Sequence, residues 1–145
     1  MKIILAPMEG VIDFAMRDIL TAGGSYDHAV TEFIRINDNL LSKSVFYRYA
    51  PELLTGGQTK SGTPVYIQLL GQHKEWMAEN AYRAWEVGAP GIDLNFGCPA
   101  RTVNNHKGGS ILLKEPDVVH SIVKAVRQAV PDVIPVSVKM RLGYE

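Results

Sequence analysis

The sequence predicts an α/β fold built on a parallel β-sheet, and two observations support this prediction. Short apolar runs typical of strands alternate with longer stretches of helical periodicity along the 145 residues. No internal repeat, low-complexity tract or block of like charge breaks this alternation. Repeated alternation favours parallel strands joined by right-handed crossovers, and both an open doubly wound sheet and an eight-stranded barrel begin in this way.

The first two strands enclose a helix whose ends are marked by capping residues. We expect a strand at 2–6, a helix at 14–22 and a second strand at 28–33. Asp13 is placed to cap the helix N-terminus, and the pair Gly23-Gly24 ends the helix. The first strand is followed by APMEGV instead of the glycine-rich turn of a dinucleotide-binding fold, which disfavours that fold.

The middle of the chain continues the same pattern. We expect a helix at 37–49, a loop at 51–62, where turn residues are frequent, and a strong strand at 64–71. The next helix is expected at 74–88, with Gly88 at its end. One face of this helix should carry Trp76, Ala81, Tyr82 and Trp85.

The last three elements are expected to be a strand at 91–97, an amphipathic helix at 116–130 and a strand at 134–143. Pro116 suits the first turn of this helix. The chain therefore supplies about four and a half β/α units, whereas a complete barrel has eight units and about 250 residues. We expect residues 1–145 to be the N-terminal part of a longer protein.

Composition narrows the class of protein. The 15 basic and 15 acidic side chains balance, which disfavours nucleic-acid binding through bulk charge but leaves a local basic groove open. The single cysteine forms no internal disulfide, and the histidines have no metal-ligand spacing. No apolar run approaches the roughly 18 residues that span a membrane, and the apolar start is too short for a secretory signal. We expect a cytoplasmic protein without a membrane or metal site.

Polar residues gather where the predicted strands end. Functional groups of parallel α/β folds lie at the carboxyl ends of the strands. Strand alternation places Ser137, Lys139 and Arg141 on one face of the last strand. In the same way, Asp93 and Asn95 share one face of the strand before it.

Lys139 and Gln68 suggest a flavin as ligand. A buried lysine at the mouth of a barrel needs an anion or an electron-rich ring, and the N1–C2 region of a reduced flavin carries such negative charge. Gln68, at the end of the third strand, offers a donor and an acceptor to the imide edge of a flavin. The alternatives are a solvent-exposed strand end for Lys139 and a capped polar strand end for Gln68.

The only cysteine, Cys98, follows the fourth strand between Gly97 and Pro99. Pro99 fixes a backbone dihedral angle, and Gly97 permits close approach of the backbone to a ligand. A thiol with an ordinary pKa of about 8.5 is mostly protonated at neutral pH and can donate a proton, whereas a thiolate nucleophile would need a cation such as Arg101 nearby. The alternative is a small buried hydrophobe.

Several motifs together resemble the tRNA-dihydrouridine synthase family. They are APMEGVID with Arg17 after it, TEF, QLLG, DLNFGCP, GGSILL and VKMRLG, in the order and at the spacing of that family. The segments APMEGV and TEFIRI resemble the bacterial C-type group, which acts on uridine 16 of the tRNA D-loop.

The resemblance implies that residues 1–145 form the N-terminal part of an FMN-bound TIM barrel, with the rest of the barrel and a helical tRNA-binding domain outside this chain. It implies reduction of the C5–C6 double bond of uridine, with hydride from flavin N5 to C6, a proton to C5 and NADPH as reductant. The positions that match the family's site are Pro7, Met8, Glu9, Gln68 and Lys139 for FMN, Cys98 as the general acid, and Arg35, Asn95 and Arg141 for the tRNA.

Two other functions stay open at this point. One is an FMN-barrel oxidoreductase that acts on a free pyrimidine or another small molecule. The other is a non-catalytic or truncated RNA-binding protein. The first is tested by whether unmodified tRNA or free pyrimidine stimulates the oxidation of NADPH. The absence of bound flavin in the full-length product would favour the second.

Overall fold

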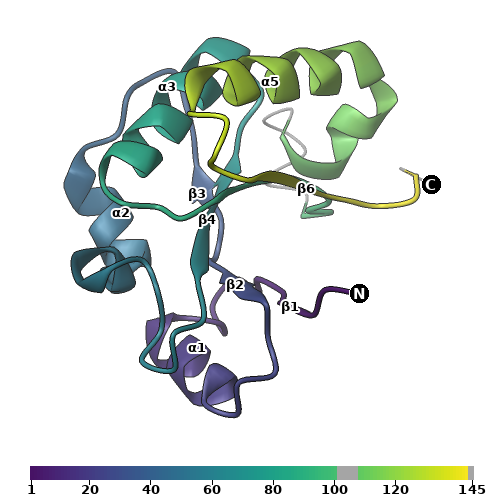
Figure 1. Ribbon diagram of the computed structural model, residues 1–145. Helices are drawn as coiled ribbons and strands as arrows, with labels where there is room; N and C mark the ends of the chain where they lie inside the picture. The colour runs from purple at the N-terminus through teal and green to yellow at the C-terminus, as the bar shows by residue number, and fades with distance from the viewer. Residues whose placement is uncertain (101–107, 144–145) are drawn as a thin grey trace.

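The computed structural model describes residues 1–100 and 108–143, and its centre is a parallel β-sheet. The sheet order is β1-β2-β4-β5-β6, with the short β3 beside β4, and all these pairs are parallel. Figure 1 shows β1 and β6, the two ends of this order, on the side of the molecule where both termini lie, so the sheet curves. The strands are β1 (Ile4–Leu5), β2 (His28–Val30), β3 (Ile34–Arg35), β4 (Val65–Leu70), β5 (Ile92–Phe96) and β6 (Val136–Met140).

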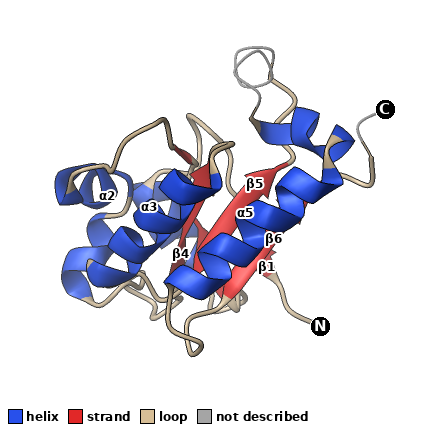
Figure 2. Ribbon diagram, turned by 90° about the horizontal axis from the view of Figure 1, so that it is seen from above, coloured by secondary structure: helices blue, strands red, loops and turns tan. Residues whose placement is uncertain are grey.

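Helices cover the outer face of the curved sheet. Seen from above, α3 (Lys74–Glu86) and α5 (Pro116–Ala129) lie side by side over the strands (Figure 2). The other helical elements are α1 (Phe14–Thr21), α2 (Lys43–Tyr49) and the 3-10 helices η1 (Pro51–Thr55) and η2 (Gly109–Lys114). The predicted fold class is confirmed, because a parallel sheet with outer helices forms the half-barrel expected for the N-terminal portion of a TIM barrel.

Strand alternation separates the core from the polar face of the sheet. The fully buried strand residues in the core cluster with α3 and α5 include Ile67, Leu69, Ile92 and Leu94. Each of these side chains stabilises the fold by roughly 1.5–3 kcal/mol through burial. Because successive side chains point to opposite faces, Gln68, Asp93 and Asn95 project from the inner, concave face.

The capping residues act as the sequence predicts. The Asp13 side chain accepts a hydrogen bond of 2.9 Å from the backbone N–H of Met16 at the start of α1. Pro116 begins α5, and Gly88 follows the end of α3 with a φ of 100° that favours glycine. Among the described helices, none combines the length and apolar character needed to cross a membrane.

The predicted strand at 28–33 is wrong in its second half, where the chain breaks into β2 and β3. β4 pairs with β2 at Val30–Tyr66 and with β3 at Ile34–Leu69. Between these two pairs the chain advances by four residues from Val30 to Ile34, but by only three residues along β4. The extra residue makes a bulge, which local polar contacts stabilise. Thr31 Oγ1 accepts from the backbone N–H of Gln68, and the Glu32 carboxylate accepts from the backbone N–H of Gly10.

The helix predicted at 37–49 begins only at Lys43. The fully buried Asn80 of α3 holds the preceding segment in a non-helical form. Its Nδ2 donates to the carbonyl of Asn39 over 3.0 Å, and its Oδ1 accepts from the N–H of Leu41 over 2.9 Å. A contact distant in sequence therefore overrides the local helical pattern.

Two further expectations need correction. The segment 51–62 was expected to be a loop throughout, but it begins with the 3-10 helix η1. Of the four residues expected near one face of α3, Tyr82 and Trp85 have their ring centroids 5.2 Å apart, but Tyr82 is 46% exposed and lies outside the buried part of the helix. The buried residues of α3 are Met77, Asn80, Ala81 and Ala84, which share one side at 3.6 residues per turn.

Arg17, which belongs to the first motif, ties α1 to η1. Its fully buried guanidinium forms a two-point ion pair with the Glu52 carboxylate, with distances of 2.8 and 3.0 Å. It also donates to the carbonyl oxygens of Ile12 and Tyr49. Arg17 therefore has a structural role.

Candidate active site at the carboxyl edge of the sheet

A pocket of about 170 Å³ lies where the parallel strands end. All the predicted site residues except Met8 and Arg35 line it. The lining residues are Pro7, Glu9, Phe33, Gln68, Asn95, Gly97, Cys98, Pro99, Lys139 and Arg141. They come from segments that follow or end β1, β2, β4, β5 and β6, which the parallel arrangement brings to one edge.

A chain of carboxamide hydrogen bonds forms the floor of this pocket. Asn95 Nδ2 donates to Gln68 Oε1 over 2.9 Å. Asn95 Oδ1 accepts from the backbone N–H groups of Gly97 and Cys98 over 3.0 and 3.1 Å. The Asn95 side chain thus anchors the start of the cysteine loop to the strand that precedes it.

Asp93 and Ser137 extend this chain across the sheet. Gln68, Asp93 and Ser137 are direct neighbours in the register of β4, β5 and β6. Gln68 Nε2 donates to Asp93 Oδ2, and Ser137 Oγ donates to Asp93 Oδ1, both over 2.6 Å. Gln68 is 0% exposed and Asp93 is 5% exposed, so these short polar contacts are shielded from water.

Cys98 is half-buried and borders the pocket, so it is not a residue of the closed core. Its loop has further supports besides Asn95. The Cys98 carbonyl accepts from the N–H of Ser110 over 2.9 Å, and Arg141 Nε donates to the Gly97 carbonyl over 2.8 Å. Arg101, the possible cationic neighbour of the thiol, lies outside the described residues.

Lys139 differs from the expectation in being exposed, because β6 is at the edge of the described sheet. Its amine nevertheless lies beside the cysteine loop, since a Cβ placed on Gly97 would be 3.6 Å from Lys139 Nζ. The amine makes no ion pair or hydrogen bond with another residue in the described part of the chain. A cation without a partner among the described residues and a thiol therefore border one pocket.

Met8 and Arg35 do not line this pocket. Met8 is 57% exposed, and its carbonyl accepts hydrogen bonds from the N–H groups of Val11 and Ile12. Arg35 borders a neighbouring cavity of about 240 Å³ at the ends of β3 and β4. His73 Nε2 lies 3.4 Å from the Asp38 carboxylate in that cavity.

The inner face of the sheet holds another cavity of about 240 Å³, which shares Pro7 and Lys139 with the carboxyl-edge pocket. His28 borders it, is 6% exposed, and stacks on the Tyr66 ring at 4.1 Å. The Nε2 atom of His28 has no hydrogen-bond partner among the described residues. Burial lowers the pKa of His28, partly opposed by the charge of Asp93, and burial raises the pKa of Tyr66.

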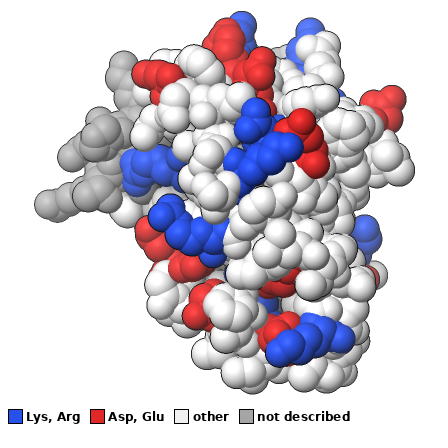
Figure 3. All heavy atoms as spheres, turned by 90° about the vertical axis from the view of Figure 1, so that its left-hand side faces the viewer, with Lys and Arg blue, Asp and Glu red and all other residues white. Residues whose placement is uncertain are grey.

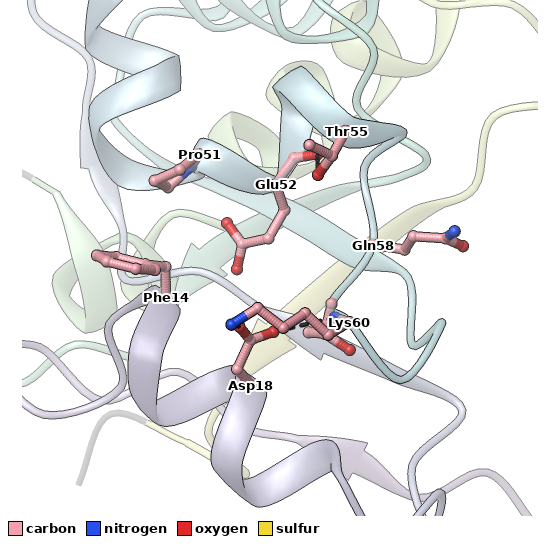
Figure 4. A pocket seen from close by; sticks show the side chains of 8 residues that line it. Phe14, Asp18, Pro51, Glu52, Thr55, Gln58 and Lys60 are labelled. Atoms are coloured by element: carbon pink, nitrogen blue, oxygen red, sulfur yellow. Dashed lines mark hydrogen bonds and ion pairs between the residues drawn. The ribbon is translucent and has the colours of Figure 1, made fainter.

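A larger cavity of about 450 Å³ lies beside α1 but has little chemistry to offer (Figure 4). Figure 4 shows Phe14 and Asp18 of α1 facing Glu52 of η1. Lys60 pairs with Asp18 over 3.3 Å, and Glu52 is held by Arg17. Its charged groups neutralise one another, so we do not regard it as the active site.

Sequence reasoning missed Phe33, which lines the pocket because of the bulge between β2 and β3. That bulge has no signal in the apolar pattern of the strand. It also missed the roles of Asp93 and Ser137, although strand alternation places both on the faces that carry Asn95 and Lys139. Within the described residues, no group of three or more His, Cys, Asp or Glu side chains could hold a metal ion.

The fold and the pocket together define an α/β protein of the barrel class, with its site at the carboxyl edge of parallel strands. Residues 4–145 match the family described as Dihydrouridine synthase (Dus), and the chain belongs to this family.

Proteins named tRNA-dihydrouridine(16) synthase are similar to this chain over its whole length. Those of Vibrio parahaemolyticus and Vibrio cholerae are 60% and 59% identical over 145 residues, and that of Pseudomonas syringae is 57% identical. Each comparison covers 100% of this chain but only 45–46% of the relative. The chain thus spans slightly less than half the length of these relatives.

Proposed function

We propose that the protein reduces uridine to 5,6-dihydrouridine in the D-loop of tRNA, at position 16, with FMN as bound cofactor and NADPH as reductant. The observation that carries this proposal is that the Cys98 thiol and the Lys139 amine border the same pocket. The names of the relatives support the substrate and the position. Residues 1–145 would form the N-terminal part of the barrel, with further barrel strands and a helical tRNA-binding domain supplied by the rest of the protein, and a tRNA substrate would place it in the cytoplasm.

The groups around the pocket fit a flavin. Lys139 offers a cation without a partner in the described part of the chain, which suits the electron-rich N1–C2 region. Gln68 lies at the same pocket and has hydrogen-bonding capacity beyond its bonds to Asp93 and Asn95, since each carboxamide has two donor hydrogens and two lone pairs. Pro7, Met8 and Glu9 would lie against the ring. FMN, when bound, supplies the hydride that C6 of the uracil receives.

The pocket alone is smaller than the roughly 300–1,000 Å³ of typical ligand sites. It shares Pro7 and Lys139 with the inner-face cavity of about 240 Å³, and the flavin ring would extend from one to the other over the concave side of the sheet.

Cys98 would act as the general acid in this reaction. Hydride addition at C6 leaves negative charge at C5 and O4 of the uracil, and the thiol gives its proton to C5. General acid catalysis of this kind contributes about 10²–10⁴-fold to a rate. The Gly97 and Cys98 N–H groups donate to Asn95, and the Cys98 carbonyl accepts from Ser110, so the loop is held in place and the thiol is positioned before the base arrives.

The tRNA would approach from the carboxyl edge. Asn95 and Arg141 border the pocket, and Arg35 borders the neighbouring cavity, where it could meet the nucleotides on either side of the target. The target base must leave its stack to enter, which costs little in a loosely stacked loop. On the face shown in Figure 3, the acidic and basic side chains of the described residues are interspersed and form no continuous basic track.

Two single substitutions in the full-length protein test the proposal by separating flavin binding from proton transfer. Cys98→Ala should keep its flavin and its reduction by NADPH but reduce tRNA about 10²–10⁴-fold more slowly. Lys139→Ala should instead lose flavin on purification, because the cation that balances the ring is missing. Flavin absorbance and dihydrouridine formed in unmodified tRNA are the two measurements.

Lys124→Ala is the matched control, because this exposed lysine lies on α5, away from the pocket, and should keep both properties. Undiminished tRNA reduction by Cys98→Ala would remove the acid role of the thiol. Stimulation of NADPH oxidation by free pyrimidine, but not by tRNA, would favour a small-molecule oxidoreductase instead.

A further inference from the structure

Asp93 does not line the carboxyl-edge pocket, although it borders the inner-face cavity beside it. Both oxygens of its carboxylate accept hydrogen bonds from neighbouring strands. Oδ2 accepts from Gln68 and Oδ1 from Ser137, each over 2.6 Å, and the residue is 5% exposed. Hydrogen bonds to a buried carboxylate are stronger than those between neutral groups.

A chain of hydrogen bonds joins Asp93 to the cysteine loop, and the groups at its two ends determine which atom donates in every bond. A carboxylate only accepts, so Gln68 must turn its NH₂ group toward Asp93 and its oxygen toward Asn95. The backbone N–H groups of Gly97 and Cys98 only donate, so Asn95 must turn its oxygen toward them. All donors therefore point the same way along one chain from the Cys98 backbone to Asp93.

We propose that Asp93 is a positioning residue that fixes the Gln68 and Asn95 carboxamides and, through Asn95, the backbone that carries Cys98. Its effect on catalysis rests on the proposed function, whereas its effect on the cysteine loop does not. Without the Asp93 acceptor, the Gln68 amide is free to turn over, and Asn95 loses the neighbour that holds its NH₂ group. The Asn95 carboxamide is then less restrained, and its hydrogen bonds from the Gly97 and Cys98 N–H groups weaken, while the contacts of the loop to Ser110 and Arg141 remain.

The test compares three variants of the full-length protein in two assays. Asp93→Ala removes the acceptor, and Asp93→Asn restores it, because the new carboxamide oxygen can accept from Gln68 while its NH₂ group donates to Ser137 Oγ. Asn80→Ala is the control for general destabilisation, because Asn80 is a fully buried polar residue of α3 with partners only on the outer side of the sheet. The first assay is the rate of alkylation of Cys98 by iodoacetamide, read by peptide mass spectrometry without any substrate. The second is the rate of tRNA reduction at saturating tRNA.

Asp93→Ala should raise the Cys98 alkylation rate by roughly threefold to tenfold, the factor that one lost hydrogen bond produces. It should lower the rate of tRNA reduction by about tenfold with little change in KM for tRNA, since positioning affects kcat. Asp93→Asn should stay close to the wild type in both assays. Asn80→Ala should lower the unfolding midpoint but leave Cys98 alkylation unchanged.

An alkylation rate in Asp93→Ala equal to that of the wild type, or an equal rise in Asn80→Ala, would overturn the proposal. If Asp93→Ala does not fold, Gln68→Ala cuts the same chain and must raise the alkylation rate, and an unchanged rate would overturn the proposal equally. If the wild type does not reduce tRNA but the alkylation pattern holds, the proposed function fails and the positioning role of Asp93 stands.

Discussion

Gln68, Asp93 and Asn95 are polar residues in strands that are otherwise apolar, and each finds its hydrogen-bond partner on a neighbouring strand or the following loop. A buried polar group without a partner costs about 1–3 kcal/mol, so such a chain must be complete to be tolerated. The sequence could place these residues at the strand ends through alternation alone. It could not show that they form hydrogen bonds with one another, because the apolar pattern of each strand does not determine the register of β4, β5 and β6.

His28 is a residue whose burial predicts a pH dependence of stability. Burial lowers its pKa below the ordinary value of 6.5, so the folded state takes up a proton less readily than the unfolded state. Stability due to this group is therefore complete above pH 6.5 and falls as the pH drops below it, where the unfolded state binds more protons. Asp93 and Asp27 oppose this effect, and Lys2 adds to it.

His28→Phe should remove this sensitivity, because the ring keeps its stacking on Tyr66 but cannot take up a proton. Urea unfolding midpoints of the full-length protein at about pH 7 and about pH 5.5 give the comparison, and the wild type should lose more stability than the variant between them. An equal loss in both proteins would show that other groups govern the acid range.

At the scale of elements, the regular strand–helix alternation was predictable and the irregular segments were not. The ranges of α1, α3 and α5 follow from periodicity and caps such as Asp13 and Pro116. The late start of α2 depends on Asn80, far away in sequence, and the bulge between β2 and β3 depends on contacts of Thr31 and Glu32. In both places hydrogen bonds between residues distant in sequence override the structure that the local pattern predicts.

The buried ion pair of Arg17 and Glu52 connects α1 to η1. We therefore expect removal of one partner to destabilise the fold more than removal of both. Arg17→Met should destabilise the fold by about 3–5 kcal/mol, because it leaves the Glu52 carboxylate buried without its partner. The double variant Arg17→Met with Glu52→Leu should recover most of that loss, since no buried charge remains.

Urea unfolding of the two variants beside the wild type measures this difference in the free energy of unfolding. A double variant as unstable as Arg17→Met alone would show that the further bonds of Arg17 to Ile12 and Tyr49, and not the charge pair, hold α1 in place.

At the scale of the whole molecule, the parallel sheet explains why most of the candidate site was predictable. Parallel strands bring their carboxyl ends to one edge, so Glu9, Gln68, Asn95 and Lys139 meet although 130 residues of sequence separate the first from the last. Met8 and Arg35 were placed by resemblance to a family motif, and the local turn at Met8 and the position of β3 set their side chains apart from the pocket. Family likeness assigns a position in the chain but not the direction of a side chain.

The central claim is that one pocket at this edge serves uridine reduction in tRNA through Cys98. Mass mapping of dihydrouridine in tRNA from cells that lack the gene, with the wild-type or the Cys98→Ala gene returned, tests it most directly. We expect dihydrouridine to be missing at position 16 alone, to return with the wild type and to stay missing with Cys98→Ala. Unchanged dihydrouridine at position 16 in cells without the gene, or full recovery with Cys98→Ala, would contradict the account.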